Sequence, residues 1–460
     1  MAGPISVILH GERDCGNSFV HHRMPAPHRF FTTAITEEEA TSGRVDAPLA
    51  ECLRLVLEET NPSAVLVLHT CLLSMIGSEP QKVIEEVVRD TGSSVPVLFL
   101  DTGGLRLSGQ AQMADWLYAT LASLPQLPLA EEGWRERWLP LLVEEAHLLD
   151  RSIREEGAGL DEGCCSPAPL KDRSLEPEAF LERLRDSLSG ARRPGDRISN
   201  LIGVESGGLI RSEALRVLFE AGVVVAGIFP EGAHLRQWRR ISHARLNVVV
   251  DRGLYPRLLE RLERGYGMET LEVPLPIGLS QTERFYALVG ERLGLAEALR
   301  SARQAHREAA EAAVESFRRR ARGLRLALGL RMLNNYEADQ LAYGGMGDLM
   351  AFEELGFDIT LLVQGPPEAA GRFALMLETL GCKLPMQVFS SPWSLAPLLA
   401  EGGFEVAYLA DHAAEEARKA KVPMMVSRSL EPFFSGVAPN LERLGELLGL
   451  AGRTGGEGAP

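Results

Sequence analysis

Several features are absent from this 460-residue chain, and each absence excludes a class of protein. No apolar run is long enough to cross a bilayer, and no basic, cleavable leader precedes the first strand-like segment. The six cysteines do not form the pattern of a disulfide framework, so we expect a reducing, cytoplasmic compartment. The net charge of −15 argues against nucleic acid and against an anionic membrane surface as partners.

A complete nucleotide-binding motif is also absent. The Gly344-Gly345-Met346-Gly347 turn precedes a predicted helix, whose N-terminal amides would suit a phosphate. The turn lacks the full dinucleotide fingerprint, and the chain has no P-loop lysine. We therefore expect that this chain binds no nucleotide.

What the sequence does contain is an alternation of apolar strands and amphipathic helices. Its composition, 45% hydrophobic and 24% charged, is that of a soluble globular protein, and its length suggests about three domains. The predicted fold class is α/β, with three Rossmann-like, doubly wound units whose mostly parallel sheets surround a central cleft. The predicted domains are an N-terminal α/β domain over residues 1–150, a linker or surface insertion over 151–195, a second α/β domain with a connecting helix over 196–335, a third α/β domain over 336–453 and a disordered tail over 454–460.

Local patterns predict the individual elements. Thr36 and Glu39 have the spacing of a capping box at a helix start, and Ser212 is a candidate cap for a later helix. The predicted strands are 5–9, 64–71, 95–100, 197–204, 223–229, 246–250, 340–343 and 358–363. The predicted helices are 47–59, 82–90, 212–221, 233–242, 302–322 and 349–355.

Two of the cysteines follow buried strands of the first domain. Cys15 comes after the 5–9 strand and a polar turn, and Cys71 is at the carboxyl end of the 64–71 strand. Ligands of open parallel sheets bind beyond the carboxyl ends of the strands, so the two thiols are candidate neighbours in space. An iron–sulfur cluster is a common reason to gather thiolates, whereas the alternative is a pair of ordinary semi-buried thiols. The remaining thiols that we expect to be incidental or structural are Cys164, Cys165 and Cys382.

The order and spacing of several motifs resemble those of the nitrogenase component 1 family, the large subunits of nitrogenase and nitrogenase-like reductases. The resemblance covers most of the chain. It rests on Leu9–Cys15 (LHGERDC), Phe31–Glu37 (FTTAITE), His69–Gly77 (HTCLLSMIG), Ile277–Phe285 (IGLSQTERF) and the Gly-Gly turn and helix within 340–356.

This resemblance implies that Cys15 and Cys71 bind an iron–sulfur cluster at a subunit interface. Family members with an eight-iron cluster carry an earlier cysteine, which a chain beginning at Met1 does not supply, so we expect a 4Fe–4S cluster completed by two thiols from each of two chains. Asp14 is a weaker candidate ligand, because relatives that reduce tetrapyrroles use an aspartate, and its alternative is an ordinary turn carboxylate. His10 and His69 are also weaker candidates, which either donate to sulfur and relay protons or satisfy backbone carbonyls in their turns.

The resemblance also has limits that define the expected function. Asp251 stands where cofactor-bearing relatives have a cysteine ligand, and no histidine occurs around Arg428, so this chain is closer to cluster-only or β-type members. We expect one oxidoreductase component of an ATP-dependent, nitrogenase-like reductase, without an assigned catalytic residue. Its expected partners are an identical or sister subunit, in a homodimer, heterodimer or heterotetramer, an ATP-hydrolysing homodimeric iron–sulfur reductase and a small-molecule substrate. The alternatives are a metallocluster assembly scaffold and a redox-silent structural subunit.

Overall fold

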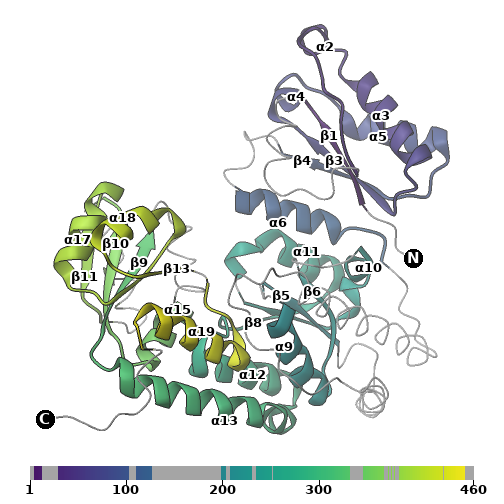
Figure 1. The fold of residues 1–460 in the computed structure, drawn as a ribbon. Helices are drawn as coiled ribbons and strands as arrows, with labels where there is room; N and C mark the ends of the chain where they lie inside the picture. Colours follow the sequence, from purple (N-terminus) through teal and green to yellow (C-terminus); the bar gives the residue numbers. More distant parts are fainter. Residues whose placement is uncertain are drawn as a thin grey trace, which may run out of the picture. The chain divides into compact units, whose positions relative to one another are not determined.

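The computed structural model describes three β-sheets with their covering helices (Figure 1). The described residues are 5–12, 29–102, 110–126, 198–203, 208–229, 235–250, 252–331, 346–366, 371, 374–375, 378, 383–427 and 429–450. Among the predictions, Asp14, Cys15, Cys164, Cys165, Asp251, Cys382, Arg428, the 340–343 strand, the 151–195 linker and the tail lie outside them. The chain divides into two compact units. The first comprises Met1–Leu129, Ala226–Asn247 and Leu254–Thr270, and the second comprises Ala130–Val225, Val248–Gly253 and Leu271–Pro460.

The first sheet has the strand order β2-β1-β3-β4, and all its strand pairs are parallel. The strands are β1 (Ile5–His10), β2 (Phe30–Thr32), β3 (Ala64–His69) and β4 (Val97–Asp101). Alternate residues point to opposite faces of a strand, so each strand supplies both faces of the sheet. One face packs against helices α3 (Asp46–Glu59) and α5 (Pro80–Thr91), and the other packs against α6 (Gln110–Leu121).

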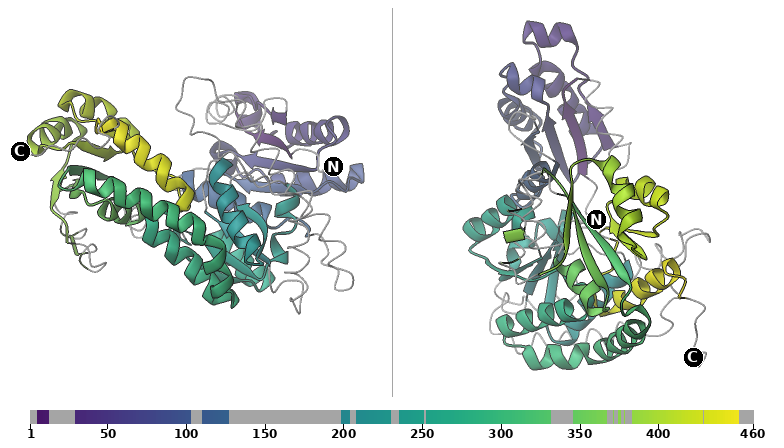
Figure 2. Two further views of the ribbon diagram at one scale, coloured as in Figure 1. Left: turned by 60° about the horizontal axis from the view of Figure 1, so that its bottom comes forward. Right: turned by 90° about the vertical axis from the view of Figure 1, so that its left-hand side faces the viewer.

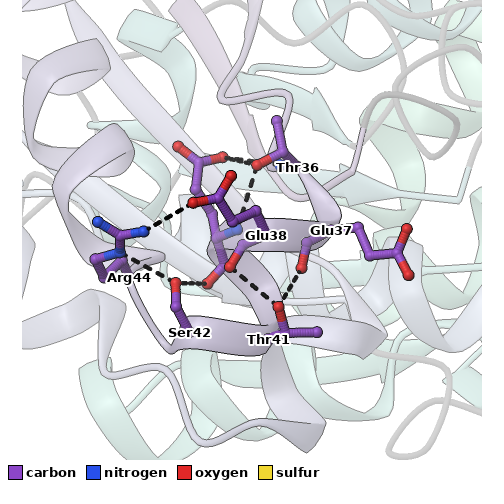
Figure 3. A network of polar contacts seen from close by, with 7 residues as sticks. Thr36, Glu37, Glu38, Thr41, Ser42 and Arg44 are labelled. Carbon is purple, nitrogen blue, oxygen red and sulfur yellow. Dashed lines mark hydrogen bonds and ion pairs between the residues drawn. The ribbon is translucent and has the colours of Figure 1, made fainter.

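Helix α2 (Glu37–Ser42) begins with the predicted capping box (Figure 3). The Glu39 amide donates to Thr36 Oγ1 at 3.3 Å, and the Glu39 carboxylate accepts from the Thr36 amide at 2.8 Å. Arg44 forms an ion pair with Glu38 at 3.2 Å just beyond the helix end, where Gly43 takes a left-handed φ of 69°. Thr41 and Ser42 bond to carbonyls of the preceding turn, so the short helix is held at both ends.

The second sheet has the order β6-β5-β7-β8. Its strands are β5 (Ile198–Ile202), β6 (Val224–Phe229), β7 (Leu246–Val249) and β8 (Glu269–Glu272), and its helical segments are α9 (Gly208–Glu220), α10 (Leu235–Trp238), η3 (Ile241–His243), η4 (Arg252–Leu254) and α11 (Pro256–Tyr266). Ser212 was predicted to cap a helix, but it lies inside α9, because no helix-breaking residue separates it from Gly208. The predicted 233–242 helix is also wrong in length, since the backbone leaves the helical region at Arg240 and the Ser242 amide bonds to Gln126 at 3.3 Å.

The third sheet has the order β11-β10-β9-β12-β13, with parallel neighbours throughout. Its strands are β9 (Arg325–Arg331), β10 (Asp358–Gln364), β11 (Met386–Phe389), β12 (Val406–Leu409) and β13 (Met424–Val426), and its helical segments are α15 (Met346–Glu354), η6 (Pro392–Ser394), α17 (Leu395–Gly402), η7 (Asp411–Ala413) and α18 (Ala414–Ala420). The central strand β9 was not predicted. A Cβ at its Gly329 would lie 2.3 Å from Leu409 Cδ2, so the glycine that interrupts the strand pattern is what lets β12 pack beside it.

Three long helices pack side by side in the second unit (Figure 2). They are α12 (Gly278–Leu293), α13 (Ala296–Ala321) and α19 (Phe433–Leu447). Helix α13 confirms the predicted connecting helix and begins six residues earlier than its predicted start at 302. Glu354 accepts from the Leu279 and Ser280 amides at 2.7 and 2.8 Å and so caps α12 from α15.

The predicted α/β class with parallel sheets is confirmed. The predicted domain boundaries stay predictions. In the part of the chain that the structure describes, no helix is both long enough and apolar enough to cross a membrane.

Candidate functional site at the carboxyl ends of the first sheet

Three polar side chains form a row across the end of the first sheet. The register pairs His10 with His69 and His69 with Asp101 on three adjacent strands. The period of two places all three on the face that carries Ile8 and Val67, which is the face covered by α3 and α5. The row therefore continues an apolar core at the edge where parallel sheets bind their ligands.

His10 is fully buried at the end of β1. Its Nδ1 lies 3.1 Å from Thr33 Oγ1, and its ring stacks on that of His69 with the centroids 5.7 Å apart. Burial, and secondarily the neighbouring His69, lowers the pKa of His10 to about 3. The imidazole is therefore neutral at physiological pH, and its Nε2 has no hydrogen-bond partner among the residues that the structure describes.

His69 is linked to Asp101 through a hydroxyl group of the next helix. Ser74 Oγ donates to Asp101 Oδ1 at 2.8 Å and lies 3.2 Å from His69 Nδ1. Because the hydroxyl hydrogen points to the carboxylate, a lone pair of the Ser74 hydroxyl is left to accept from a proton on His69 Nδ1. Thr102 donates both its amide and its hydroxyl to the His69 carbonyl, at 2.9 and 2.8 Å, and so fixes the end of β3.

Cys71 begins the short helix α4 (Cys71–Met75) immediately beyond β3, and it is exposed. The preceding residue, Thr70, is only 4% exposed, and its amide donates to the His10 carbonyl at 3.1 Å. Gly11 packs so closely against the Thr70 side chain that a Cβ on Gly11 would lie 2.1 Å from Thr70 Cγ2. The chain leaving β1 therefore runs directly beside the turn that presents the Cys71 thiol.

The outer side of α4 next to Cys71 is apolar. Met75 is 61% exposed and Ile76 is 42% exposed, so two consecutive large apolar side chains face outward here. The other described cysteine, Cys52, lies half-buried on α3, where burial and then Glu51 raise the pKa of its thiol to about 11. Cys71 is thus the more accessible of the two described thiols.

The structure brings together some predicted site residues and leaves others untested. His10, His69 and Cys71 gather at one sheet edge, whereas Cys15 and Asp14 lie outside the described residues. Within those residues, no three His, Cys, Asp or Glu side chains are arranged to hold a metal ion. The sequence reasoning missed Glu12, Thr33, Ser74 and Asp101 as site residues. For Asp101 one signal was available in the sequence, its position directly after the predicted 95–100 strand.

Comparison with known proteins gives one family and several distant relatives. Residues 4–335 match the family described as Nitrogenase component 1 type Oxidoreductase. The chain is 26% identical over 293 residues to the nitrogenase iron-molybdenum cofactor biosynthesis protein NifE of Klebsiella pneumoniae, an alignment that covers 54% of this chain and 62% of NifE. It is 30% identical over 115 residues to one subunit of the light-independent protochlorophyllide reductase of Synechococcus sp. (strain JA-3-3Ab), covering 24% of this chain and 22% of that protein.

The chain thus spans less than two thirds of the length of either of these curated relatives. Among solved structures, that of nitrogenase Cp1 at pH 6.5 has a TM-score of 0.62 at 12% identity, covering 97% of this chain and 89% of the other. At this identity the likeness is one of fold.

Proposed function

Because the chain belongs to the nitrogenase component 1 type oxidoreductase family, we propose that it is a subunit of a nitrogenase-like reductase complex. In this proposal an iron–sulfur cluster is bound beyond the carboxyl ends of β1 and β3. Cys15 and Cys71 would hold this cluster, which would take single electrons from a separate ATP-hydrolysing iron–sulfur protein and supply them to a small unsaturated molecule. The partner chain is either a second copy or a sister subunit.

The exposed Cys71 thiol at the end of β3 is the observation that supports this proposal most directly. Thiolates are the usual ligands of iron–sulfur clusters, so the residue type and its exposure fit the group. Cys15 lies four residues beyond Gly11, whose backbone runs beside Thr70, and it is the second proposed ligand. When bound, the cluster would accept and release one electron at a time.

The surrounding residues have supporting roles in this proposal. His69, Ser74 and Asp101 hold the first turn of α4 against the sheet and so orient Cys71. Met75 and Ile76 offer an apolar surface beside the thiol, which favours a subunit contact that would exclude water from the cluster. The neutral, buried His10 places no positive charge beneath the site.

A scaffold for metallocluster assembly is a second candidate function. The longer of the two alignments is with NifE, which is named for cofactor biosynthesis, and it covers 293 residues against 115 for the protochlorophyllide reductase. A scaffold would bind a cluster at the same thiols and pass it to another protein, instead of turning over a small substrate.

Anaerobic purification with counting of iron and acid-labile sulfide tests the shared part of both candidates. The full chain, produced with its partner subunit where that is a separate chain, should carry about four iron atoms per pair of chains. Cys71→Ser should lose most of this iron, whereas Cys52→Ala, which removes a half-buried thiol of the same domain, should retain it. Full iron and sulfide in the Cys71→Ser protein would refute the site.

A second experiment separates the enzyme from the scaffold. The cluster is first reduced by the cognate ATP-dependent reductase, and its oxidation state is then followed after addition of candidate unsaturated substrates. An enzyme should be reoxidised with formation of a reduced product and should keep its iron. A scaffold should show no substrate-dependent reoxidation and should lose its iron to an acceptor protein.

A further inference from the structure

Glu12 connects the two corners of the sheet that flank the Cys71 turn. Its Oε2 accepts a hydrogen bond from Thr70 Oγ1 at 3.0 Å, although the two residues are 58 positions apart in the sequence. Its backbone is also fixed, because Glu12 forms a parallel bridge with Ile35, whose amide donates to the Gly11 carbonyl at 2.9 Å. The carboxylate is therefore held in place by contacts with two other segments of the chain.

The hydroxyl group of Thr70 bonds to Glu12 and does not cap the helix that begins after it. Thr70 is the N-cap residue of α4, where a threonine hydroxyl usually accepts from a helix amide, but here its side chain makes no such bond. The hydroxyl hydrogen is directed at Glu12 instead. This arrangement keeps a carboxylate next to the residue that precedes Cys71.

The charges of the neighbouring described residues do not cancel this carboxylate. His10 is neutral because burial lowers its pKa to about 3, and Asp101 is a second acidic group of the same sheet edge. No described lysine or arginine forms an ion pair with Glu12. Thr70 Oγ1 is 3.0 Å from the carboxylate and the Cα atoms of Thr70 and Cys71 are about 3.8 Å apart, so with the two side chains added the carboxylate lies within about 12 Å of the Cys71 sulfur.

We propose that Glu12 is a positioning residue whose carboxylate, anchored by Thr70, imposes a negative electrostatic potential at Cys71. This effect acts on the free thiol and on any group bound there. Where the proposed function holds, the same carboxylate disfavours addition of an electron to the bound cluster and lowers its midpoint potential. The first consequence requires only the protein chain, and the second rests on the proposed function.

The free thiol gives a test that needs no cluster. Neutral iodoacetamide and anionic iodoacetate both react with the thiolate, so the ratio of their rates at Cys71, measured by peptide mass spectrometry, reports the local potential independently of the thiolate fraction. Glu12→Gln keeps an acceptor for Thr70 and removes the charge. At a separation of this order the iodoacetate/iodoacetamide ratio should rise by about two- to fivefold at low salt.

The matched control is Glu58→Gln. Glu58 is exposed near the end of α3, and its replacement makes the same change in net charge without touching the Glu12–Thr70 bond. This variant should leave the rate ratio unchanged, and Glu12→Asp, which retains the charge, should stay close to the parent protein. An unchanged ratio in Glu12→Gln, or an equal rise in Glu58→Gln, would overturn the proposal.

A potentiometric titration of the loaded protein tests the second consequence. Glu12→Gln should bind as much iron as the parent protein and show a higher midpoint potential, whereas Glu58→Gln should show the parent value. Loss of iron in Glu12→Gln with retention in Glu12→Asp would make Glu12 a ligand and overturn the positioning role. If the parent protein bound no cluster, the proposed function would fail, and the rate ratio at Cys71 would still decide the role of Glu12.

Discussion

Acidification should destabilise the first sheet through His10. The pKa of this histidine falls from 6.5 to about 3 on folding, because its ring is buried with none of its surface exposed. Between these values the unfolded chain binds a proton that the folded chain does not, so stability decreases as the pH falls. Above pH 6.5 the buried histidine does not reduce the free energy of unfolding. At about pH 5 it reduces this free energy by about 2 kcal/mol, the value of RT ln[(1 + 10^1.5)/(1 + 10^−2)] for pKa values of 6.5 and about 3.

Hydrogen exchange measured by mass spectrometry is a suitable assay, because it reports the opening free energy of β1 and β3 separately from the rest of a multidomain chain. The comparison is between about pH 8 and about pH 5, after correction for intrinsic exchange rates. His10→Phe keeps a planar ring in the stack with His69 and removes the titratable nitrogen. When the pH falls from about 8 to about 5, the opening free energy of the parent protein should decrease by about 2 kcal/mol more than that of His10→Phe.

Two features of the result would separate this cause from others. His10→Phe loses the bond to Thr33 at 3.1 Å, so it should be less stable by about 1 kcal/mol at both pH values, and only the difference between them is diagnostic. His412→Gln, which replaces an imidazole that is 44% exposed, should behave as the parent protein. Equal losses of stability in the parent and in His10→Phe would refute the assignment of the pH dependence to this buried ring.

Two further predictions concern stability alone. Gly11→Ala places a methyl group 2.1 Å from Thr70 Cγ2 and should cost about 1–3 kcal/mol in urea unfolding, whereas Gly265→Ala, whose Cβ would meet ordinary contacts at 3.4 Å, should cost almost nothing. Equal stability of the two variants would contradict the close approach of β1 to the Cys71 turn. Thr36→Ala removes the acceptor of the capping box and should cost about 1 kcal/mol, while Thr41→Ala, which removes a hydroxyl bonded within the helix, should change little. The reverse order of these two losses, measured in the same assay, would show that the capping box does not stabilise α2.

The elements that were predicted best are those whose residues carry a strong local signal. The β1 and β3 runs are almost wholly apolar and are bounded by polar residues, so their positions follow from the sequence. The capping box of α2 is likewise a purely local pattern. Strand β9 was missed because its Gly329 weakens the strand signal, and the reason for that glycine, its contact with Leu409, comes from a strand about 80 residues later.

The candidate site was predictable only in part, for a similar reason. His10, His69 and Cys71 could be chosen because each comes at or just after the end of a strand. Ser74 and Asp101 were missed, because their contact joins α4 to β4 across 27 residues and depends on the register between strands. Thr70 was also hidden, since a threonine before a helix predicts a capping side chain, and here that side chain bonds to Glu12.

The requirements of folding alone do not explain the row of polar side chains, His10, His69 and Asp101, at the end of the first sheet. His10 is fully buried and His69 is 3% exposed, at positions where the preceding residues of both strands are apolar core. Burial of polar groups costs free energy that hydrogen bonds only offset, and an apolar pair in this register would complete the same core at lower cost. The histidines therefore do not serve packing alone. They lie at the same sheet edge as the exposed Cys71, and Ser74 and Asp101 complete the row, so the row gives this edge the rigid support that a binding site needs.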